Sequence, residues 1–137
     1  MNDIIDLSAV ANEQPVELKI HPDGTECKIR ITNIIQGRNK NDVPYIMPWF
    51  EDPDDVYVED FSHYLELPSK DDQPKARMKK VALLQSFATC FGLDLFAPNY
   101  DLEEAKGATG WVILGIGKNQ DGSACNKPKK YLRGEIA

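Results

Sequence analysis

Gly107-Ala-Thr-Gly-Trp-Val-Ile-Leu-Gly-Ile-Gly117 is a Gly-rich apolar run near the end of the chain, and its aliphatic and aromatic residues favour a β-strand. The next residues, Lys118-Asn-Gln-Asp-Gly122, predict a turn, because Gly tolerates the positive φ angle that tight hairpin turns require. The chain then returns through Asn126-Lys-Pro-Lys-Lys-Tyr-Leu132. The sequence therefore predicts a closing β-hairpin whose second strand carries cations beside an aromatic ring.

Extended segments precede this hairpin. Alternation of apolar and polar residues predicts strands over residues 16–20 and 27–35, paired with each other through a turn at Pro22-Asp-Gly24. A third segment is Pro44-Tyr-Ile-Met-Pro-Trp-Phe50, whose two prolines lack a backbone donor and favour an edge or bulged strand. Phe61-Ser-His-Tyr-Leu-Glu-Leu67 alternates again and predicts a fourth strand.

The periodicity changes to that of a helix between Pro74 and Phe91. Asp71 and Asp72 are the expected caps, and Gly92 is the expected stop. Val81, Leu84, Ala88 and Phe91 form one apolar stripe, which Leu83 and Phe87 widen. The first turns carry Lys75, Arg77, Lys79 and Lys80, which oppose the helix dipole and need a partner, either a DNA backbone or the acidic loops. Shorter helical turns are expected around residues 7–11 and over residues 102–106, the latter beginning at Asp101 and closed by Gly107.

The length of 137 residues fits a single domain, which we place over residues 15–137 after a flexible N-terminal arm at residues 1–14. No apolar run approaches the length of a membrane span, and the first residues are acidic where a secretory signal would be basic. We expect a cytoplasmic protein.

The formal net charge is -6, which by itself disfavours a nucleic-acid partner. The charge is, however, unevenly distributed. Residues up to Pro74 contain 6 Lys and Arg against 16 Asp and Glu, whereas residues from Lys75 onward contain 10 against 6. Such asymmetry permits a basic groove on an acidic protein.

Cys27, Cys90 and Cys125 show no CxxC spacing, so neither a disulfide framework nor a zinc knuckle is indicated. A mixed metal site that uses His21 or His63 is the remaining alternative, but we expect no metal and no cofactor. The acidic run Glu51-Asp-Pro-Asp-Asp-Val-Tyr-Val-Glu-Asp60 is interpreted as a solvated loop, since it lacks the spacing of a calcium-binding loop. His63 is interpreted as a strand residue, and the protein is not expected to be an enzyme.

The order of elements predicts a mainly β fold with one long helix. We expect an OB-fold-like five-stranded Greek-key barrel with the helix between strands 3 and 4, a fold that commonly binds single strands across its face. A half-open α+β sheet with the helix packed across it is the alternative.

Three motifs also resemble a family. The motifs are Phe61-Ser-His-Tyr-Leu-Glu-Leu-Pro68, Ser86-Phe-Ala-Thr-Cys-Phe-Gly-Leu-Asp94 and Gly107-Ala-Thr-Gly-Trp-Val112. Together with the return strand of the hairpin, they resemble small bacteriophage proteins of the replication and recombination region. Some of these are described as OB-fold single-stranded DNA-binding proteins. The resemblance covers residues 25–132 and implies sequence-tolerant binding of single-stranded DNA in phage replication or recombination, with proteins of those processes as further partners. It also implies a location in the host cytoplasm. Homo-oligomer formation stays open.

The candidate site residues follow from that hypothesis. Cations would contact phosphates, and aromatic rings would stack on bases. The cations are Arg30, Arg38, Lys40, Lys118, Lys127, Lys129 and Lys130, and the rings are Tyr45, Trp49, Trp111 and Tyr131. Trp111 lies in an apolar run typical of core, whereas Tyr45 and Tyr131 have polar neighbours typical of a surface.

Two other functions fit the same sequence. An acidic phage accessory protein that only binds other proteins would account for the negative first half of the chain. A small metal-dependent nuclease could use the carboxylates between Glu51 and Asp60, with Asp54 and Asp55 as its candidate metal ligands.

Overall fold

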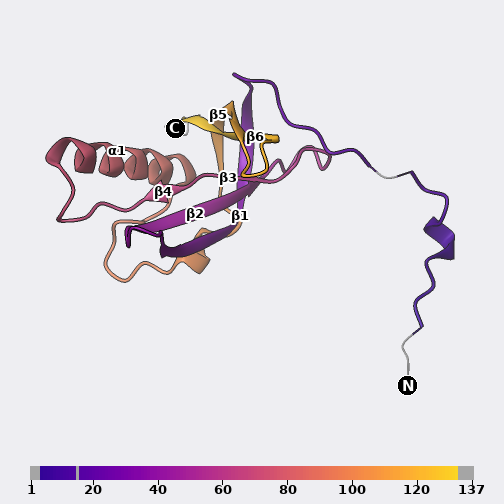
Figure 1. Cartoon of the computed structure of the whole chain (residues 1–137), viewed down its shortest axis with the longest axis horizontal. Helices are drawn as coiled ribbons and strands as arrows, with labels where there is room; N and C mark the ends of the chain where they lie inside the picture. The colour runs from indigo at the N-terminus through magenta and orange to yellow at the C-terminus, as the bar shows by residue number, and fades with distance from the viewer. Residues whose placement is uncertain (1–3, 15, 133–137) are drawn as a thin grey trace.

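The computed structural model describes residues 4–14 and 16–132, and it is mainly β with one α-helix (Figure 1). The strands are β1 (Glu26–Arg38), β2 (Pro44–Glu51), β3 (Phe61–Ser62), β4 (Leu65–Glu66), β5 (Thr109–Lys118) and β6 (Ala124–Tyr131). Helix α1 (Pro74–Phe91) lies between β4 and β5 in the chain, and two short 3-10 helices are η1 (Ser8–Val10) and η2 (Leu102–Ala105).

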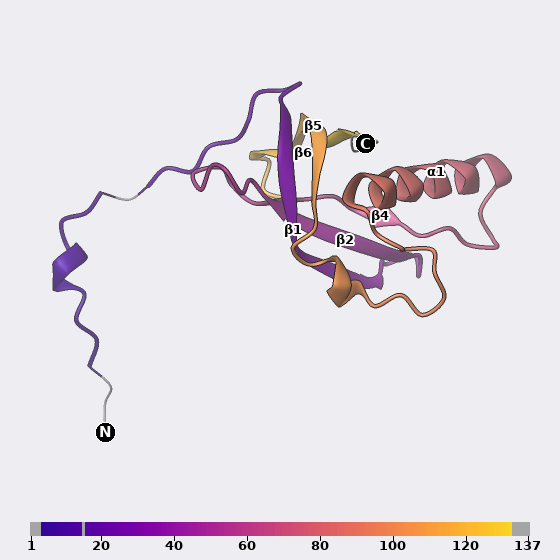
Figure 2. The same ribbon diagram turned by 180° about the vertical axis from the view of Figure 1, so that it is seen from behind.

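The strands form one open antiparallel sheet in the order β3-β2-β1-β5-β6, in which β4 also pairs with β2. β1 joins the two halves of this sheet. Its first residues pair with β5, from Glu26 opposite Ile113 to Arg30 opposite Thr109. Its later residues pair with β2, and Figure 2 shows this change of neighbour along the strand. No ladder joins β3 to β6 within the described residues.

The hydrophobic core lies between the inner face of the sheet and α1. Ile29, Phe50 and Leu114 are fully buried from the sheet side, and the helix adds Phe87 and Phe91. The rings of Phe50 and Phe91 stack with centroids 5.6 Å apart. Burying rings of this size is the main source of stability for a single small domain.

The prediction for α1 is confirmed, from Pro74 at its first turn to Gly92, which ends it with φ 69°. The predicted caps are wrong, because Gln73 is the N-cap residue and makes no side-chain cap. Asp72 instead accepts hydrogen bonds from the Ser69 backbone N–H and Lys80 Nζ, at 2.7 and 3.0 Å. Leu83 is exposed, so the apolar stripe is narrower on that side than predicted.

Acidic side chains of β4 and of the loop before α1 neutralise one of the helix cations. Lys80 Nζ lies 3.0 Å from Asp72 Oδ1 and 3.4 Å from Glu66 Oε1. The hydrogen bond to Asp72 is the main cause that raises the pKa of Lys80.

The predicted first strand is wrong. Residues 16–25 do not form a hairpin with β1; Lys19 makes one isolated parallel bridge to Val58. The Lys19 backbone N–H donates to the Tyr57 carbonyl at 2.8 Å, and Glu59 N–H donates to the Lys19 carbonyl at 2.9 Å. Val16 and Leu18 are exposed. The segment therefore lies against the acidic loop instead of entering the sheet.

The segment 44–50 forms β2, for which an edge or bulged strand was predicted. It is not an edge strand, because β1 lies on one side of it and β3 with β4 on the other. Its pairing with β1 does contain a register shift, between Ile31 and Asn33. Pro48 instead affects the segment that pairs with β2 on the side away from β1. Trp49 pairs with Ser62 and Ile46 with Leu65, whereas the residues opposite Pro48 and Met47 lie between β3 and β4. Pro48 cannot donate to a neighbour, which explains why the predicted fourth strand is divided into two short ones.

The closing hairpin is confirmed as β5 and β6, and Gly122 in its turn has φ 88°. The two predicted helical turns are present as the 3-10 helices η1 and η2, and Asp101 accepts from Glu103 N–H at 3.0 Å. Residues 4–14 are exposed and trail away from the sheet (Figures 1 and 2). None of the helices in the described part of the chain has the length and apolar composition that crossing a membrane requires.

Candidate nucleic-acid interface

An open groove of about 890 Å³ lies between the β3–β4 segment and the tip of the β5–β6 hairpin. It is lined by Met47, Trp49, Ser62, His63, Tyr64, Gly117, Lys118, Asn119, Gln120, Asp121, Cys125 and Lys127. We refer to this set as the groove. These residues come from four places along the chain. The sheet brings them together because β3 and β6, the two ends of the strand order, contact each other.

Trp49 reaches the groove through the alternation of β2. Ile46, Pro48 and Phe50 point into the core, so Met47 and Trp49 point to the outer face. Trp49 pairs with Ser62 of β3, which lies on the same face. The ring is thus held on a paired strand rather than on a loop.

Two tyrosines extend the aromatic surface. The rings of Tyr45 and Tyr64 lie 4.8 Å apart at 41°. Tyr45 also covers Gly37 of β1, where an added Cβ would lie 3.0 Å from the tyrosine Oη. Asn39, in the loop after β1, donates to Tyr64 Oη at 3.0 Å. The β1–β2 loop is therefore tied to the groove through Tyr64.

Lys127 lies in the groove because Gly117 leaves room for its side chain. A Cβ at Gly117 would lie 3.1 Å from Lys127 Cδ, so the aliphatic part of the lysine crosses the glycine. Lys118 follows directly at the end of β5. Both lysines are exposed and face the same hollow as Trp49 and Tyr64.

His63 stands at the back of the groove as a neutral side chain. Its Nδ1 lies 2.6 Å from Tyr131 Oη. Burial, followed by the positive charge of Lys127, lowers the pKa of His63 to about 4. His63 and Tyr131 thus join the β3 side of the sheet to β6 at the floor of the groove without adding charge.

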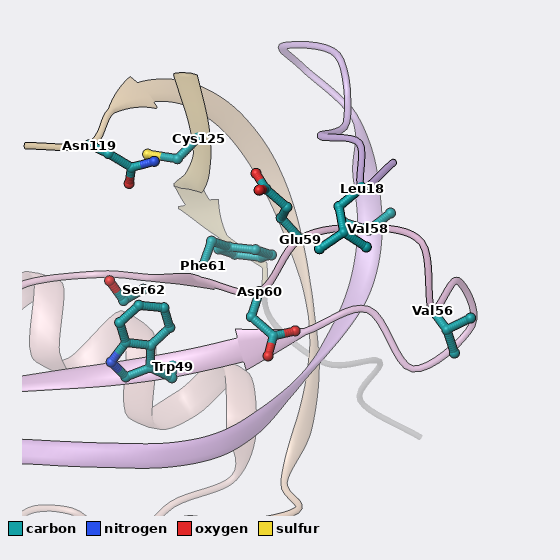
Figure 3. Close-up of a pocket in the computed structure, with 10 residues that line it drawn as sticks. All are labelled: Leu18, Trp49, Val56, Val58, Glu59, Asp60, Phe61, Ser62, Asn119 and Cys125. Carbon is teal, nitrogen blue, oxygen red and sulfur yellow. The ribbon is translucent and has the colours of Figure 1, made fainter. Parts of the chain in front are cut away.

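A second hollow of about 430 Å³ adjoins the groove and shares Trp49, Ser62, Asn119 and Cys125 with it. Figure 3 shows Trp49 and Ser62 facing Asn119 and Cys125, with Glu59 and Asp60 beside them. Burial and the charge of Glu51 raise the pKa of Asp60. The surface around Trp49 therefore has a basic, aromatic side and an acidic side.

The structure brings three of the candidate site residues into the groove, Trp49, Lys118 and Lys127, and places Tyr45 beside it. Arg38 and Lys40 belong to the connected β1–β2 tip, where Arg38 Nη1 donates to the Asp42 carbonyl at 2.9 Å. Arg30 pairs with Glu51, and Lys129 lies 3.8 Å from Asp23. Lys130 lines another hollow beside α1.

Two expectations about aromatic exposure are wrong. Tyr131 is buried with only 8% exposure, because a β-bulge in the pairing of β6 with β5 turns its ring inward after two exposed lysines. Trp111 is 51% exposed rather than in the core, and it lies outside the groove opposite Lys28 of β1. Burial of the hydroxyl raises the pKa of Tyr131 well above its ordinary value.

Sequence reasoning missed Tyr64, Met47 and the role of His63. The signal for Tyr64 was present in the alternation of residues 61–67, since inward Phe61 and Leu65 place Ser62 and Tyr64 on the outer face.

The acidic run 51–60 does not converge on one point. Asp52 Oδ2 contacts His21 at 2.8 Å, and Asp55 pairs with Lys19 at 2.9 Å. Asp52 is buried, contrary to the expectation of a solvated loop.

Comparison of the chain with protein-family models and with curated proteins gave no match.

Proposed function

We propose that this protein binds single-stranded DNA in the groove, with little dependence on base sequence. The observation that carries the proposal is that Trp49 and Tyr64 share one open hollow with Lys118 and Lys127. Aromatic rings give bases a stacking surface, and lysines beside them neutralise the phosphates that connect those bases. An apolar pocket or a positively charged patch alone would supply only one of these two contacts.

The proposed mechanism is binding without catalysis. Lys118 and Lys127 bind phosphates and so displace the counterions that are condensed on the DNA. Lys40 at the β1–β2 tip extends the cationic path. Trp49 stacks on one base, and the Tyr45–Tyr64 pair offers a second surface. Base edges receive few directed hydrogen bonds from such a site, so we expect binding to tolerate any sequence.

The arrangement of elements supports an OB-type assignment. Three features support it: the strand order, the helix between β4 and β5, and the contact of His63 with Tyr131. The sheet of the described residues is open, so the five-stranded barrel is part of the proposal. In that fold, single strands lie across the face between the loop after the first strand and the loop of the last hairpin. Asn39 and Asn119 belong to the two corresponding loops here. A role in phage replication or recombination is part of the same proposal.

The test is a titration of fluorescent oligo-dT with the full chain at two salt concentrations. We expect affinity that falls steeply as salt rises, with a slope of about 0.7 per neutralised phosphate on logarithmic axes. Absence of binding at low salt contradicts the proposal.

A second candidate is a protein-interaction module, and one specific observation favours it. The hollow beside the groove carries Glu59 and Asp60 together with exposed Leu18 and Val56. An acidic rim around apolar side chains fits a basic protein segment better than DNA. The oligo-dT titration separates the two candidates, because this module alone gives no binding at either salt concentration.

A further inference from the structure

Three side chains of metal-binding type meet outside the groove. A ring nitrogen of His21, Cys27 Sγ and a carboxylate oxygen of Asp52 all lie within 4.8 Å of one another. They come from three different segments: the chain before β1, the start of β1, and the residue after β2. The mixed set of nitrogen, sulfur and oxygen atoms is typical of sites for zinc and related transition metals rather than for magnesium or calcium.

The backbone of His21 is fixed by a buried side chain. Asn126 of β6 has 1% exposure, and its Oδ1 accepts the His21 backbone N–H at 2.7 Å. Its Nδ2 donates to the His21 carbonyl at 2.9 Å and to the Gly115 carbonyl at 3.3 Å. This clamp holds an otherwise irregular segment against the sheet, so the imidazole is presented from a defined position.

Asp52 is positioned in a similar way. Its Oδ1 accepts the Asp54 backbone N–H at 2.9 Å, while its Oδ2 lies 2.8 Å from His21 Nε2. Supporting hydrogen bonds of this kind orient metal ligands in known sites. Asp52 is also buried, and these two contacts are the partners that a buried carboxylate requires.

We propose that His21, Cys27 and Asp52 form a binding site for a zinc-type divalent metal, with water in the fourth tetrahedral position. The metal would be bound by His21 Nε2, Cys27 Sγ and one Asp52 oxygen. The thiolate and carboxylate together balance the two positive charges of the ion, so the buried cluster becomes neutral on binding. In the metal-free state, the His21–Asp52 contact holds the two ligands together.

Binding requires the ligands to lose protons. The Cys27 thiol gives its proton to solvent as the sulfur–metal bond forms, and His21 presents an unprotonated Nε2 in place of its contact with Asp52. Burial, followed by the charge of Asp52, raises the pKa of Cys27 to about 11 without metal.

The metal would connect three segments at one point. Without metal, the segment 16–21 and the loop that starts at Asp52 are joined by the backbone hydrogen bonds of Lys19, the Lys19–Asp55 ion pair and the His21–Asp52 contact. A metal that binds only the folded chain stabilises it by mass action. Leu18 and the residues 58–62 line the hollow of Figure 3, so metal binding would also fix the wall of that hollow.

The test is titration of the reduced full chain with Co²⁺, which reports a thiolate ligand by a sulfur-to-cobalt charge-transfer absorption. We expect a saturable band at one equivalent that Zn²⁺ removes by displacement. Cys27→Ser should abolish the band. Cys125→Ser is the matched control, because Cys125 is also partly buried but lies in the groove, and it should leave the band intact.

Thermal unfolding provides a second readout that does not depend on absorption. Zn²⁺ should raise the Tm of the unsubstituted chain and of Cys125→Ser, but not that of Cys27→Ser. The metal-free Tm of Cys27→Ser shows whether that variant is folded; if it is not, Asp52→Asn takes its place with the same expected loss. No band and no shift in Tm for the unsubstituted chain would overturn the proposal, as would a band that survives Cys27→Ser in folded protein.

Discussion

The two tryptophans of the chain occupy different surroundings, and this difference gives a matched pair of variants. Trp49 lies in the groove with Lys118 and Lys127, whereas Trp111 is exposed on β5 outside it. Trp49→Ala should weaken oligo-dT binding by about 1–3 kcal/mol, because one stacked base loses its platform. Trp111→Ala should leave the affinity nearly unchanged. Fluorescence anisotropy of labelled oligo-dT measures both, and equal losses would place the DNA elsewhere.

His63 makes stability depend on pH. Its pKa is about 4 in the folded chain, against 6.5 as the ordinary value. Between these two pH values the unfolded chain binds a proton at His63 that the folded chain does not bind. The stability contributed by neutral His63 is therefore fully present above pH about 6.5. It is lost as the pH falls to about 4. The loss is at most about 3 kcal/mol.

His63→Gln should flatten that part of the profile. Urea unfolding at several pH values measures the free energy of unfolding of the unsubstituted chain and of the variant. The carboxylates titrate in both proteins, so the difference between the two profiles reports His63. A parallel fall in both proteins would mean that His63 is not buried neutral.

At the level of elements, β5 depends on a glycine that lies against the end of α1. A Cβ at Gly110 would lie 2.7 Å from Cys90 Sγ and 2.8 Å from the Cys90 carbonyl oxygen. Gly110→Ala must therefore move the helix backbone, and we expect a loss of about 1–3 kcal/mol in the free energy of unfolding. Gly115→Ala in the same strand meets nothing closer than 3.4 Å and should cost little. Denaturant unfolding of both variants checks the contact; similar stabilities would contradict this packing of α1 on β5.

Strand β6 offers a charge test on one element. Lys127 faces the groove, whereas Lys130 faces the hollow beside α1. Lys127→Gln should lower the salt slope of oligo-dT binding by about 0.7, because one phosphate contact is lost. Lys130→Gln removes the same charge from the same strand and should not change the slope. Equal slopes in the two variants would mean that only net charge matters.

The elements that sequence predicted well are those stabilised by local signals. For α1 these signals are the helical period of its apolar residues, Pro74 in the first turn and Gly92 at the end. For the closing hairpin the signal is Gly122 in the turn. The strand predicted over residues 16–20 failed because alternation does not specify a partner. In the structure, β5 pairs with the first half of β1, and residues 16–21 contact the acidic loop instead.

The candidate site was predictable to a similar extent. The alternation of β2 indicates that Trp49 faces outward. The position of Lys118 at the end of β5 indicates a cation near the turn of the hairpin. Tyr131 could not be placed from its charged neighbours, because the bulge opposite Ile113 and Leu114 puts two lysines in succession on the surface before the buried ring. Convergence of His21, Cys27 and Asp52 depends on contacts between distant segments, which spacing in the sequence does not reveal.

At the scale of the whole molecule, the acidic total and the basic groove coexist because several other cations have anionic neighbours. Arg30, Lys80 and Lys129 contact Glu51, Asp72 and Asp23, respectively. Lys118 and Lys127 lie close to the aromatic rings of the groove, so local charge there differs from the net charge of -6. Association with DNA should accordingly be weak at high salt and should not follow the isoelectric point.

The most direct measurement is a map of backbone amide chemical shifts of the full chain during titration with oligo-dT. We expect the largest changes at Met47, Trp49, residues 62–64, residues 117–121 and Lys127, with smaller changes at the β1–β2 tip. Changes confined to α1 or to the acidic loop, or none at saturating oligo-dT and low salt, would contradict the claim that the groove binds single-stranded DNA.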